Sequence, residues 1–355
     1  MINSDNSHLL RKLKEIKIEL SHKCNLRCVH CSSDATDSEV TELSFEQVKR
    51  ILYEASHLSI QTVSFSGGEP LLWPELGNAV NLCLELGIRV RIYTNGTTNE
   101  ASSFLNNIQS KNISVIFSLH GFEDTHDRIT AVPGSFQKTL TTLRDTLDFG
   151  FHPEIHFVPM QLNYNEIIDF AFYLNSIGVK QISALRFVPH GRGKCMNRLA
   201  LSNSQHVQFR NFLLFLKQRN IHIRTGSPFN ILLLNDQPTC TTGTDKLIIS
   251  PDFRIYPCDA FKQIQPQDLN ITDNFSSLVN HSLQDCWNNS SYLNFVRKLS
   301  AENSPQECLS CAKYSLCRSG CLAQKFLFSN RFDDQKDPGC LLSTIGVPHA
   351  VNHFE

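Results

Sequence analysis

Short apolar runs alternate with amphipathic stretches from about residue 15 to residue 224, and this alternation limits the folds open to the chain. The runs are rich in β-branched and aromatic residues, as strands are, while the stretches between them repeat apolar residues at helical spacing. The strand-like runs are EIKIEL (15–20), TVSFS (62–66), IRVRIYT (88–94), SVIFSL (114–119), EIHFVPM (154–160) and QISALRF (181–187). Repeated strand–helix units predict an α/β fold with a parallel sheet and right-handed crossovers. Six units predict a partial (β/α)6 barrel, whose chemistry belongs at the carboxyl ends of the strands.

Local signals mark several of the predicted helices. Ser44 begins the stretch SFEQVKRILYEASHL and Gln47 follows three residues later, which is the pattern of a capping box. Gly87 and Gly178 stand where helical patterns end, as glycine commonly does. The stretch SFQKTLTTLRDTLDFG (135–150) predicts a further helix. These helices supply the crossovers that a parallel sheet requires.

The pattern changes after Arg224. Two short runs, KLIIS (246–250) and FRIYP (253–257), predict a hairpin. The stretch 282–299 predicts one or two helices, and a cysteine-rich segment follows it. We therefore predict a domain boundary near residue 226.

The 13 cysteines are many for a chain of 355 residues that shows no sign of export. The first residues, MINSDNSHLLRKLKE, lack the apolar core of a signal peptide, and no apolar run approaches the roughly 18 residues that suggest a membrane span. We therefore expect a soluble cytoplasmic protein whose cysteines act as metal ligands or catalytic groups rather than in disulfides. Most of them form two groups, from Cys24 to Cys31 and from Cys240 to Cys340.

Cys24, Cys28 and Cys31 stand at CX3CX2C spacing just after the first predicted strand. Thiolates suit zinc and iron–sulfur clusters, and a [4Fe–4S] cluster normally takes one thiolate on each iron. Three cysteines therefore leave one iron open to a ligand that is also a substrate. The spacing alone also fits a zinc site with a distant fourth ligand, or three thiols without a common role.

A second motif, FSGGEP (65–70), follows the second predicted strand. Gly67 and Gly68 allow the backbone to approach a ligand closely, and Glu69 offers a carboxylate to an ammonium group. Alone, the motif also fits an ordinary turn from a strand to a helix. One strand after CX3CX2C, it resembles the radical S-adenosylmethionine (radical SAM) superfamily, and the resemblance covers about residues 15–225.

This resemblance implies both the cofactors and the reaction. In the family, the three cysteines hold a [4Fe–4S] cluster whose open iron binds the amino and carboxylate groups of SAM, and the GGE-type segment binds the amine. An electron from the cluster splits SAM into a 5′-deoxyadenosyl radical, which takes hydrogen from the substrate. A reductase, flavodoxin or ferredoxin is then the expected electron donor.

The same resemblance suggests further contacts with SAM. His30 fills the aromatic position before the third cysteine, which lies near adenine in the family, although packing alone also explains it. Asn95 or Thr94, at the end of the third strand, and Ser118, at the end of the fourth, are expected near SAM. As polar residues at strand ends, they equally fit a helix-capping role. Arg128 follows HD in HDRIT, as an arginine does in some relatives, but its register leaves its role open.

The second group of cysteines is the most specific pattern in the chain. Its order, C…C…CX2CX5CX3C…C, resembles the SPASM extension of radical SAM enzymes, and a zinc ribbon is the alternative. The seven residues are Cys240, Cys258, Cys308, Cys311, Cys317, Cys321 and Cys340. The resemblance divides the chain into an N-terminal segment (1–14), a radical SAM core (15–225) and a cysteine-rich SPASM domain (226–355) with two auxiliary [4Fe–4S] clusters.

In the SPASM pattern the cysteines divide into two ligand sets. The distal cluster takes Cys308, Cys311, Cys317 and Cys340, and the proximal cluster takes Cys240, Cys258 and Cys321. Fully ligated relatives have a further cysteine soon after the first, whereas residues 241–257 contain none. The proximal cluster therefore has an open iron or a ligand from elsewhere; Cys286 is the nearest spare cysteine, although burial as a small apolar residue also explains it. Phe253 occupies a turn position where relatives commonly have glycine.

Two more cysteines stand outside both groups. Cys83 lies on an apolar helical face and is expected in the core. Cys195 follows the sixth predicted strand, beside His190 and Arg192, and is therefore expected on the active-site side. Its thiol could donate a hydrogen atom to a substrate radical, as in radical epimerases, or it could be a structural or surface cysteine. His190 and Arg192 fit either substrate contact or loop positioning.

We therefore expect a radical SAM/SPASM enzyme with three [4Fe–4S] clusters that matures a ribosomally synthesised peptide by crosslinking, thioether formation or epimerisation. Only 23 residues precede Cys24, too few for a leader-peptide-binding domain, so a separate protein would supply that recognition. One alternative is a small-molecule enzyme, such as a sugar or aminoglycoside epimerase, dehydrogenase or dehydratase. Others are an iron–sulfur electron carrier or regulator, and a zinc-binding interaction module. The net charge of −1 predicts neither a nucleic-acid nor a membrane partner.

Overall fold

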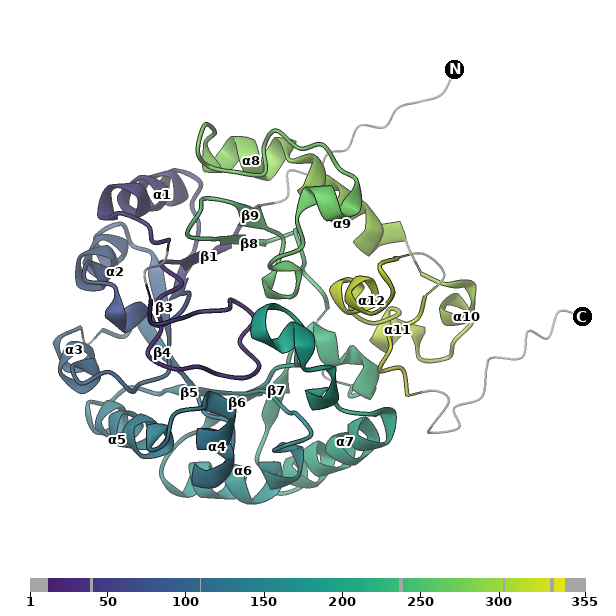
Figure 1. Ribbon diagram of the computed structural model, residues 1–355, viewed down its shortest axis with the longest axis horizontal. Helices are drawn as coiled ribbons and strands as arrows, with labels where there is room; N and C mark the ends of the chain where they lie inside the picture. The colour runs from purple at the N-terminus through teal and green to yellow at the C-terminus, as the bar shows by residue number, and fades with distance from the viewer. Residues whose placement is uncertain are drawn as a thin grey trace, which may run out of the picture.

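The computed structural model describes residues 12–341, except 39–40, 109, 236–238, 303 and 333–334. A curved nine-stranded sheet forms its centre, in the order β7-β6-β5-β4-β3-β2-β1-β8-β9 (Figure 1). Neighbouring strands pair in parallel, except for the antiparallel hairpin of β8 and β9. The strands are β1 (Glu15–Glu19), β2 (Thr62–Ser66), β3 (Arg89–Thr94), β4 (Ile113–Ser118), β5 (Glu154–Phe157), β6 (Gln181–Ala184), β7 (Ile223–Thr225), β8 (Lys246–Ile249) and β9 (Ile255–Tyr256).

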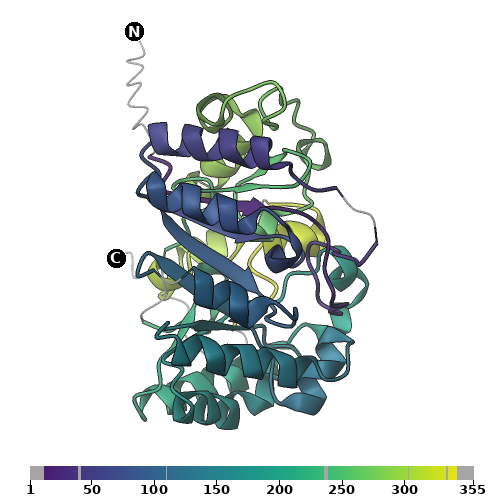
Figure 2. The same ribbon diagram turned by 90° about the vertical axis from the view of Figure 1, so that its left-hand side faces the viewer.

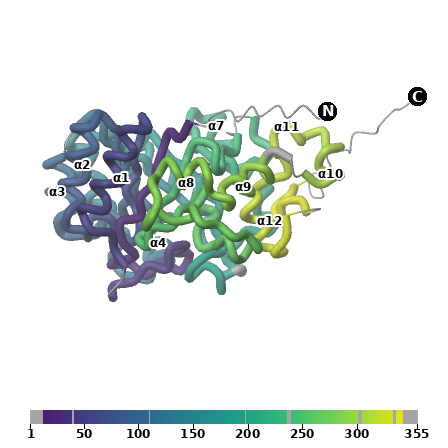
Figure 3. Tube along the Cα trace, turned by 90° about the horizontal axis from the view of Figure 1, so that it is seen from above, coloured from purple at the N-terminus to yellow at the C-terminus, as the bar shows by residue number. Residues whose placement is uncertain are grey.

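Helices cover the outer side of the curved sheet, and Figure 2 shows α1, α2, α3 and α5 stacked along it. Figure 3 shows α9 to α12 at the end of the molecule away from α1, α2 and α3. The helices are α1 (Phe45–His57), α2 (Leu76–Glu85), α3 (Ala101–Asn107), α4 (Glu123–Thr130), α5 (Ser135–Asp148), α6 (Ile167–Ser176), α7 (Asn203–Lys217), α8 (Leu283–Asn289), α9 (Ser291–Glu302), α10 (Gln306–Leu309), α11 (Tyr314–Cys317) and α12 (Leu322–Ser329). None of the helices in the described ranges has both the length and the apolar character needed to span a bilayer.

The local predictions agree with the structure. All six predicted strands are present, and β2 has the predicted bounds. Ser44 caps α1 as expected: its backbone N–H donates to Gln47 Oε1 at 2.7 Å, and its hydroxyl accepts from the Gln47 N–H at 3.3 Å. The hairpin predicted near residue 250 is formed by β8 and β9. Short-range patterns in the sequence were therefore sufficient for these elements.

The sheet has two more parallel strands than the six predicted. β7 pairs with β6, and β8 pairs in parallel with β1, which lies more than 200 residues earlier in the chain. β7 has only three residues, too few to show a pattern, and no local signal shows that β8 has a second partner. The sheet stays open, with β7 and β9 at its edges, so the barrel is partial as expected. The boundary predicted near residue 226 stays a prediction, and residues 1–11 of the predicted N-terminal segment lie outside the described residues.

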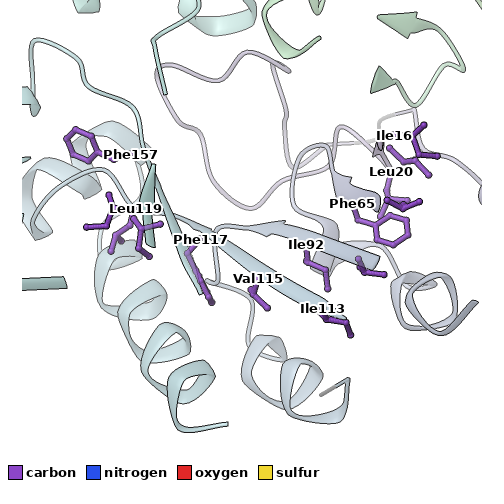
Figure 4. Packing of buried hydrophobic residues seen from close by; sticks show 14 of the residues in the cluster. Ile16, Leu20, Phe65, Ile92, Ile113, Val115, Phe117, Leu119 and Phe157 are labelled. Atoms are coloured by element: carbon purple, nitrogen blue, oxygen red, sulfur yellow. The ribbon is translucent and has the colours of Figure 1, made fainter. Parts of the chain in front are cut away.

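The main core lies between the sheet and its helices. Figure 4 shows apolar side chains of successive strands in this layer, among them Phe65, Phe117 and Phe157. These three phenylalanines have no exposed surface, and burial of such a side chain contributes about 1.5–3 kcal/mol each. This packing holds the strands in register and thereby fixes the loops at their carboxyl ends.

Phe253, at the turn position where relatives commonly have glycine, adopts a left-handed backbone conformation. Its φ is 64° in the turn between β8 and β9, a region where a side chain costs about 1–2 kcal/mol. The ring is buried, and Arg50 lies over it with its guanidinium carbon 5.8 Å from the ring centre. Packing of the ring therefore offsets the strain of the turn.

Candidate active site

The CX3CX2C segment lies on the long connection from β1 to α1. Figure 1 shows this connection, in dark purple, crossing the interior of the curved sheet. Cys24 is buried, Cys28 and Cys31 are half-buried, and all three line one cavity of about 240 Å³. The backbone N–H of Cys24 donates to Thr36 O at 2.6 Å, which closes the segment into a loop. The three cysteines therefore face one space, as their spacing predicted.

Burial controls the charge of these thiols. It raises the pKa of Cys24 to about 12 and also raises the pKa of Cys28. Neighbouring thiols add to the effect, because one thiolate disfavours a second nearby. Cys24 and Cys28 are therefore protonated at neutral pH until a metal displaces their protons.

Gly67 and Gly68 bring the loop after β2 against the start of the cysteine loop. The Gly68 N–H donates to Ser21 O at 2.8 Å, and the Glu69 N–H donates to Lys23 O at 2.8 Å. A Cβ on Gly68 would stand 2.0 Å from Lys23 O, and one on Gly67 would stand 2.3 Å from Ser21 O. The two glycines therefore bring the backbone close to the cysteine loop, and their predicted approach to a ligand stays a prediction.

Replacing Gly68 with alanine is expected to displace the cysteine loop. The added carbon meets backbone atoms rather than a flexible side chain. We expect the free energy of unfolding to fall by about 3 kcal/mol, the upper end of ordinary overpacking. Gly77→Ala is the matched control, since its Cβ would meet only Phe104 Cε2, at 3.8 Å, inside α2. Gly77 lies in the first turn of α2, where alanine is well tolerated, so equal urea denaturation of the two variants would contradict the expectation.

Glu69 lies behind the cavity lining and holds a neighbouring loop. Its Oε1 accepts from Thr94 Oγ1 at 2.7 Å and from the Leu71 N–H at 3.0 Å, and its Oε2 accepts from the Asn95 N–H at 2.7 Å. Burial raises its pKa to about 7, although these hydrogen bonds act to lower it. The structure thus gives Glu69 a positioning role that the sequence did not show. Direct contact of Glu69 with an ammonium group stays a prediction.

The polar residues expected at the strand ends do line the cavity. Thr94, Asn95 and Ser118 all contribute to its wall. Asn95 also reaches the cysteine loop: its Nδ2 donates to Asn25 Oδ1 at 3.0 Å and lies 3.8 Å from Cys24 Sγ. A donor beside a sulfur ligand stabilises its thiolate form and orients it. Asn95 is therefore placed to act on Cys24, a contact that no motif predicted.

His30 and His120 line another side of the cavity, and His126 lies behind them. The ring of His30 lies 4.5 Å from that of His120, which stacks on His126 at 5.9 Å. Burial lowers the pKa values of His30 and His126 to about 4, so both are neutral at pH 7. Among the described residues, neither His30 Nδ1 nor His126 Nε2 has a hydrogen-bond partner, and both atoms are buried. The sequence had pointed to His30 alone, because His120 and His126 join it only through the fold.

The loop after β6 contributes less than expected. Cys195 is exposed and does not line the cavity, so its predicted role as a hydrogen-atom donor gains no support from its position. His190 is buried, with its Nε2 3.1 Å from Ala260 O. Arg192 does line the cavity. Arg128 is exposed on α4, outside the lining.

The structure brings together the cysteines predicted for the distal cluster. A second, smaller cavity is lined by Cys308, Cys311, Cys317 and Cys340. Burial raises the pKa of Cys308 to about 11 and that of Cys317 to about 12, and the neighbouring thiols contribute. Four thiols around one space form a suitable donor set for a complete cluster.

The cysteines predicted for the proximal cluster also gather in one place. Cys258 is near enough to Cys240 and Cys321 for their charges to interact, and burial raises its pKa to about 12. The Cys240 thiol donates to Thr242 Oγ1 at 3.2 Å. The set thus holds three thiols and a hydroxyl.

Cys83 and Cys286 are core residues, as expected. Both have no exposed surface. Cys83 lies on α2, and Cys286 lies on α8, where its thiol donates to Ser277 O at 3.3 Å. Cys286 therefore lies apart from the proximal set.

A larger cavity, of about 440 Å³, lies between the ends of β5 and β6 and the C-terminal helix α12. Its lining includes Arg186, Phe187 and Phe328 but none of the cysteines. We place the chemistry in the cavity of about 240 Å³, because it is lined both by Cys24, Cys28 and Cys31 and by the polar residues at the strand ends.

The donor sets fit iron–sulfur clusters. Cys24, Cys28 and Cys31 line one cavity and the four predicted distal cysteines line another, and a [4Fe–4S] cluster normally takes one thiolate on each iron. Beside the first set, Ser66 Oγ and His30 Nδ1 are buried without partners among the described residues. These two atoms could bind a polar ligand such as SAM.

Two family models match the chain. The model described as Radical SAM superfamily matches residues 18–174, and the SPASM model, described as an iron–sulfur cluster-binding domain, matches residues 240–312. These matches cover the first cysteine group and much of the second.

Individual relatives agree with the family matches. Mycofactocin maturase MftC of Mycobacterium tuberculosis is 30% identical over 339 residues, covering 91% of this chain and 81% of the relative. AdoMet-dependent heme synthase of Methanosarcina barkeri is 23% identical over 347 residues, covering 91% of this chain and 95% of the relative. The structure of Streptococcus suis SuiB bound to its precursor peptide SuiA has the same fold, with a TM-score of 0.74 and 20% identity over 93% of this chain and 76% of that one.

Proposed function

This chain belongs to the radical SAM superfamily and is an enzyme that uses SAM and iron–sulfur clusters, and from this premise we propose that it matures a ribosomally synthesised peptide. The expected changes are a crosslink, a thioether or an epimerised residue. Two findings support a peptide: the extended similarity to a maturase, and the fold shared with an enzyme whose structure includes its precursor peptide.

We propose that Cys24, Cys28 and Cys31 hold the cluster that binds SAM. Bound together, the cluster and SAM supply one-electron cleavage of SAM and the radical that takes hydrogen from the substrate. The chain's own residues orient these groups: Gly67 and Gly68 bring backbone to the cysteine loop, and the buried histidines exclude water. The single observation that carries the proposal is the cavity at the strand ends that these thiols share with Thr94, Asn95 and Ser118.

We also propose two auxiliary [4Fe–4S] clusters, for a total of three. The distal one takes Cys308, Cys311, Cys317 and Cys340, and the proximal one takes Cys240, Cys258 and Cys321. The Thr242 hydroxyl, already in contact with Cys240, is a candidate neighbour for the remaining iron. We further propose a domain boundary near residue 226 and a cytoplasmic location. The electron donor would be a flavodoxin or ferredoxin, and a separate protein would bind the leader peptide.

Anaerobic reconstitution with iron and sulfide tests this assignment. Three clusters require about twelve irons per chain. With dithionite and SAM, we expect 5′-deoxyadenosine, and with a short peptide encoded beside the gene we expect a peptide of altered mass or, for epimerisation, deuterium uptake from D₂O. About four irons per chain would contradict the auxiliary clusters, and absence of 5′-deoxyadenosine would contradict the reaction.

A small-molecule substrate is the second candidate. The match to a heme synthase covers nearly the whole of both chains, so the same architecture serves chemistry other than peptide maturation. A small molecule that raises 5′-deoxyadenosine formation and is itself converted, while neighbouring peptides remain unchanged, would favour this candidate.

A further inference from the structure

Arg192 reaches from the loop after β6 across the CX3CX2C segment. Its Nε donates to Cys28 O at 3.0 Å, and its Nη1 donates to Ala35 O at 2.6 Å. Its own backbone N–H donates to Cys31 O at 3.1 Å. One residue thus binds the main chain of two of the three cysteines and the end of their loop.

The neighbouring Gly191 shows how closely the two loops lie. A Cβ on Gly191 would stand 2.5 Å from Cys31 O, so a side chain here would separate the loops. Gln263 secures the contact from the SPASM side: its Oε1 accepts from the Gly191 N–H at 3.0 Å, and its Nε2 donates to Ser32 O at 2.6 Å. Arg192 is therefore held in place rather than lying free on the surface.

The carbonyl contacts matter more than the ion pair that Arg192 also makes. Its Nη1 lies 3.1 Å from Asp34 Oδ1, but the two side chains are 28% and 59% exposed. Such a pair contributes little in water. The hydrogen bonds to Cys28 O and Ala35 O are partly buried and so less weakened by water, and their ionised donor makes them about twice as strong as neutral hydrogen bonds.

We propose that Arg192 is a positioning residue for the SAM-binding cluster, because it fixes the main chain of Cys28 and Cys31 and thereby the direction of their thiolates. The inference rests on the ligands assigned under the proposed function. Fixing the main chain of Cys28 and Cys31 would hold their thiolates in one arrangement for the cluster. Arg192 acts through the cysteine loop, so it is required for productive SAM binding more than for cluster retention.

The test compares Arg192→Gln with the wild-type protein after anaerobic reconstitution. We expect the variant to retain an iron content near that of the wild type. Its reduced cluster with SAM should give an EPR spectrum that differs from that of the wild-type protein with SAM, and its KM for SAM should be about tenfold higher. The size follows from other outer-shell partners of metal ligands, whose loss typically costs about 10–100-fold. Arg198→Gln is the matched control, because Arg198 follows in the same loop, is exposed, and donates from its Nη2 to Met196 Sδ at 3.9 Å rather than to the cysteine loop.

Arg192→Lys separates charge from geometry. Lysine keeps the charge but cannot reach both carbonyls with a planar group, so we expect only partial recovery of the KM. If Arg192→Gln fails to retain iron, the same measurements on Arg192→Lys decide. If the variant that retains iron shows the same EPR response to SAM and the same KM as the wild type, the role of Arg192 is overturned, and the proposed function is not affected. A wild-type protein whose EPR spectrum does not respond to SAM would overturn the proposed function along with it.

Discussion

Replacing Cys28 with alanine is expected to remove about four of roughly twelve irons and to abolish 5′-deoxyadenosine formation. Cys28 shares its cavity with Cys24 and Cys31, and two thiolates cannot hold a cluster that also leaves an iron for SAM. The loss should exceed the roughly 10–100-fold that removal of an outer-shell partner causes. Iron analysis, absorbance near 400 nm and a chromatographic assay of 5′-deoxyadenosine measure the three effects.

Cys83→Ala serves as the control for this change. Cys83 is also a buried cysteine, but it lies on α2 in the apolar core. Its loss leaves a small cavity and should leave the iron content and 5′-deoxyadenosine formation near wild-type values. Full iron content and activity in Cys28→Ala would instead remove the basis for assigning the first cluster to this loop.

Much of the fold could be predicted because its signals are local. Apolar periodicity located β1 to β6, and the capping box at Ser44 located the start of α1. The pairing of β8 with β1 could not be predicted in this way, because it joins segments more than 200 residues apart. β8 is apolar on both faces, which fits a strand inside a sheet as well as one in a hairpin.

The candidate site likewise has parts that the sequence predicted and parts that only the fold reveals. The cysteine spacings and the glycines after β2 are short motifs; the structure places the first three cysteines and both glycines around one cavity and the four predicted distal cysteines around another. Asn95, His120 and Arg192 acquire their contacts from other segments of the chain, so no spacing reveals them. Glu69 belongs to both groups. The motif identified it as a candidate site residue, but only the fold shows that its carboxylate holds the loop after β3.

Asp337 illustrates a residue that only the fold makes important. Its carboxylate accepts from both Nη atoms of Arg186 at 2.7 Å, from the Cys321 N–H at 2.9 Å and from the Gly339 N–H at 2.8 Å. It therefore joins a cysteine of the proximal set to the residue just before Cys340 of the distal set. The Arg186 and Asp337 side chains are only 7% and 1% exposed.

Asp337→Asn is expected to lower the free energy of unfolding by about 3–5 kcal/mol, because it leaves the Arg186 guanidinium buried without a counter-charge. For a chain of 355 residues, this corresponds to a fall in apparent Tm of about 4–7 °C. Burial alone would raise the pKa of Asp337, but the Arg186 charge and the hydrogen bonds lower it. The stabilisation is therefore present at neutral pH and is lost as the pH falls through the lowered pKa of the folded state.

Asp37→Asn is the control that isolates burial. The Arg27–Asp37 pair has the same N···O distance of 2.7 Å, but its side chains are 65% and 59% exposed, so its loss should cost no more than about 1 kcal/mol. The double variant Arg186→Met/Asp337→Leu removes both charges and should recover part of the stability lost in Asp337→Asn. Recovery should be incomplete, because leucine cannot accept from the Cys321 and Gly339 N–H groups. Equal losses in Asp337→Asn and Asp37→Asn would show that the buried pair does not hold the two cysteine sets together.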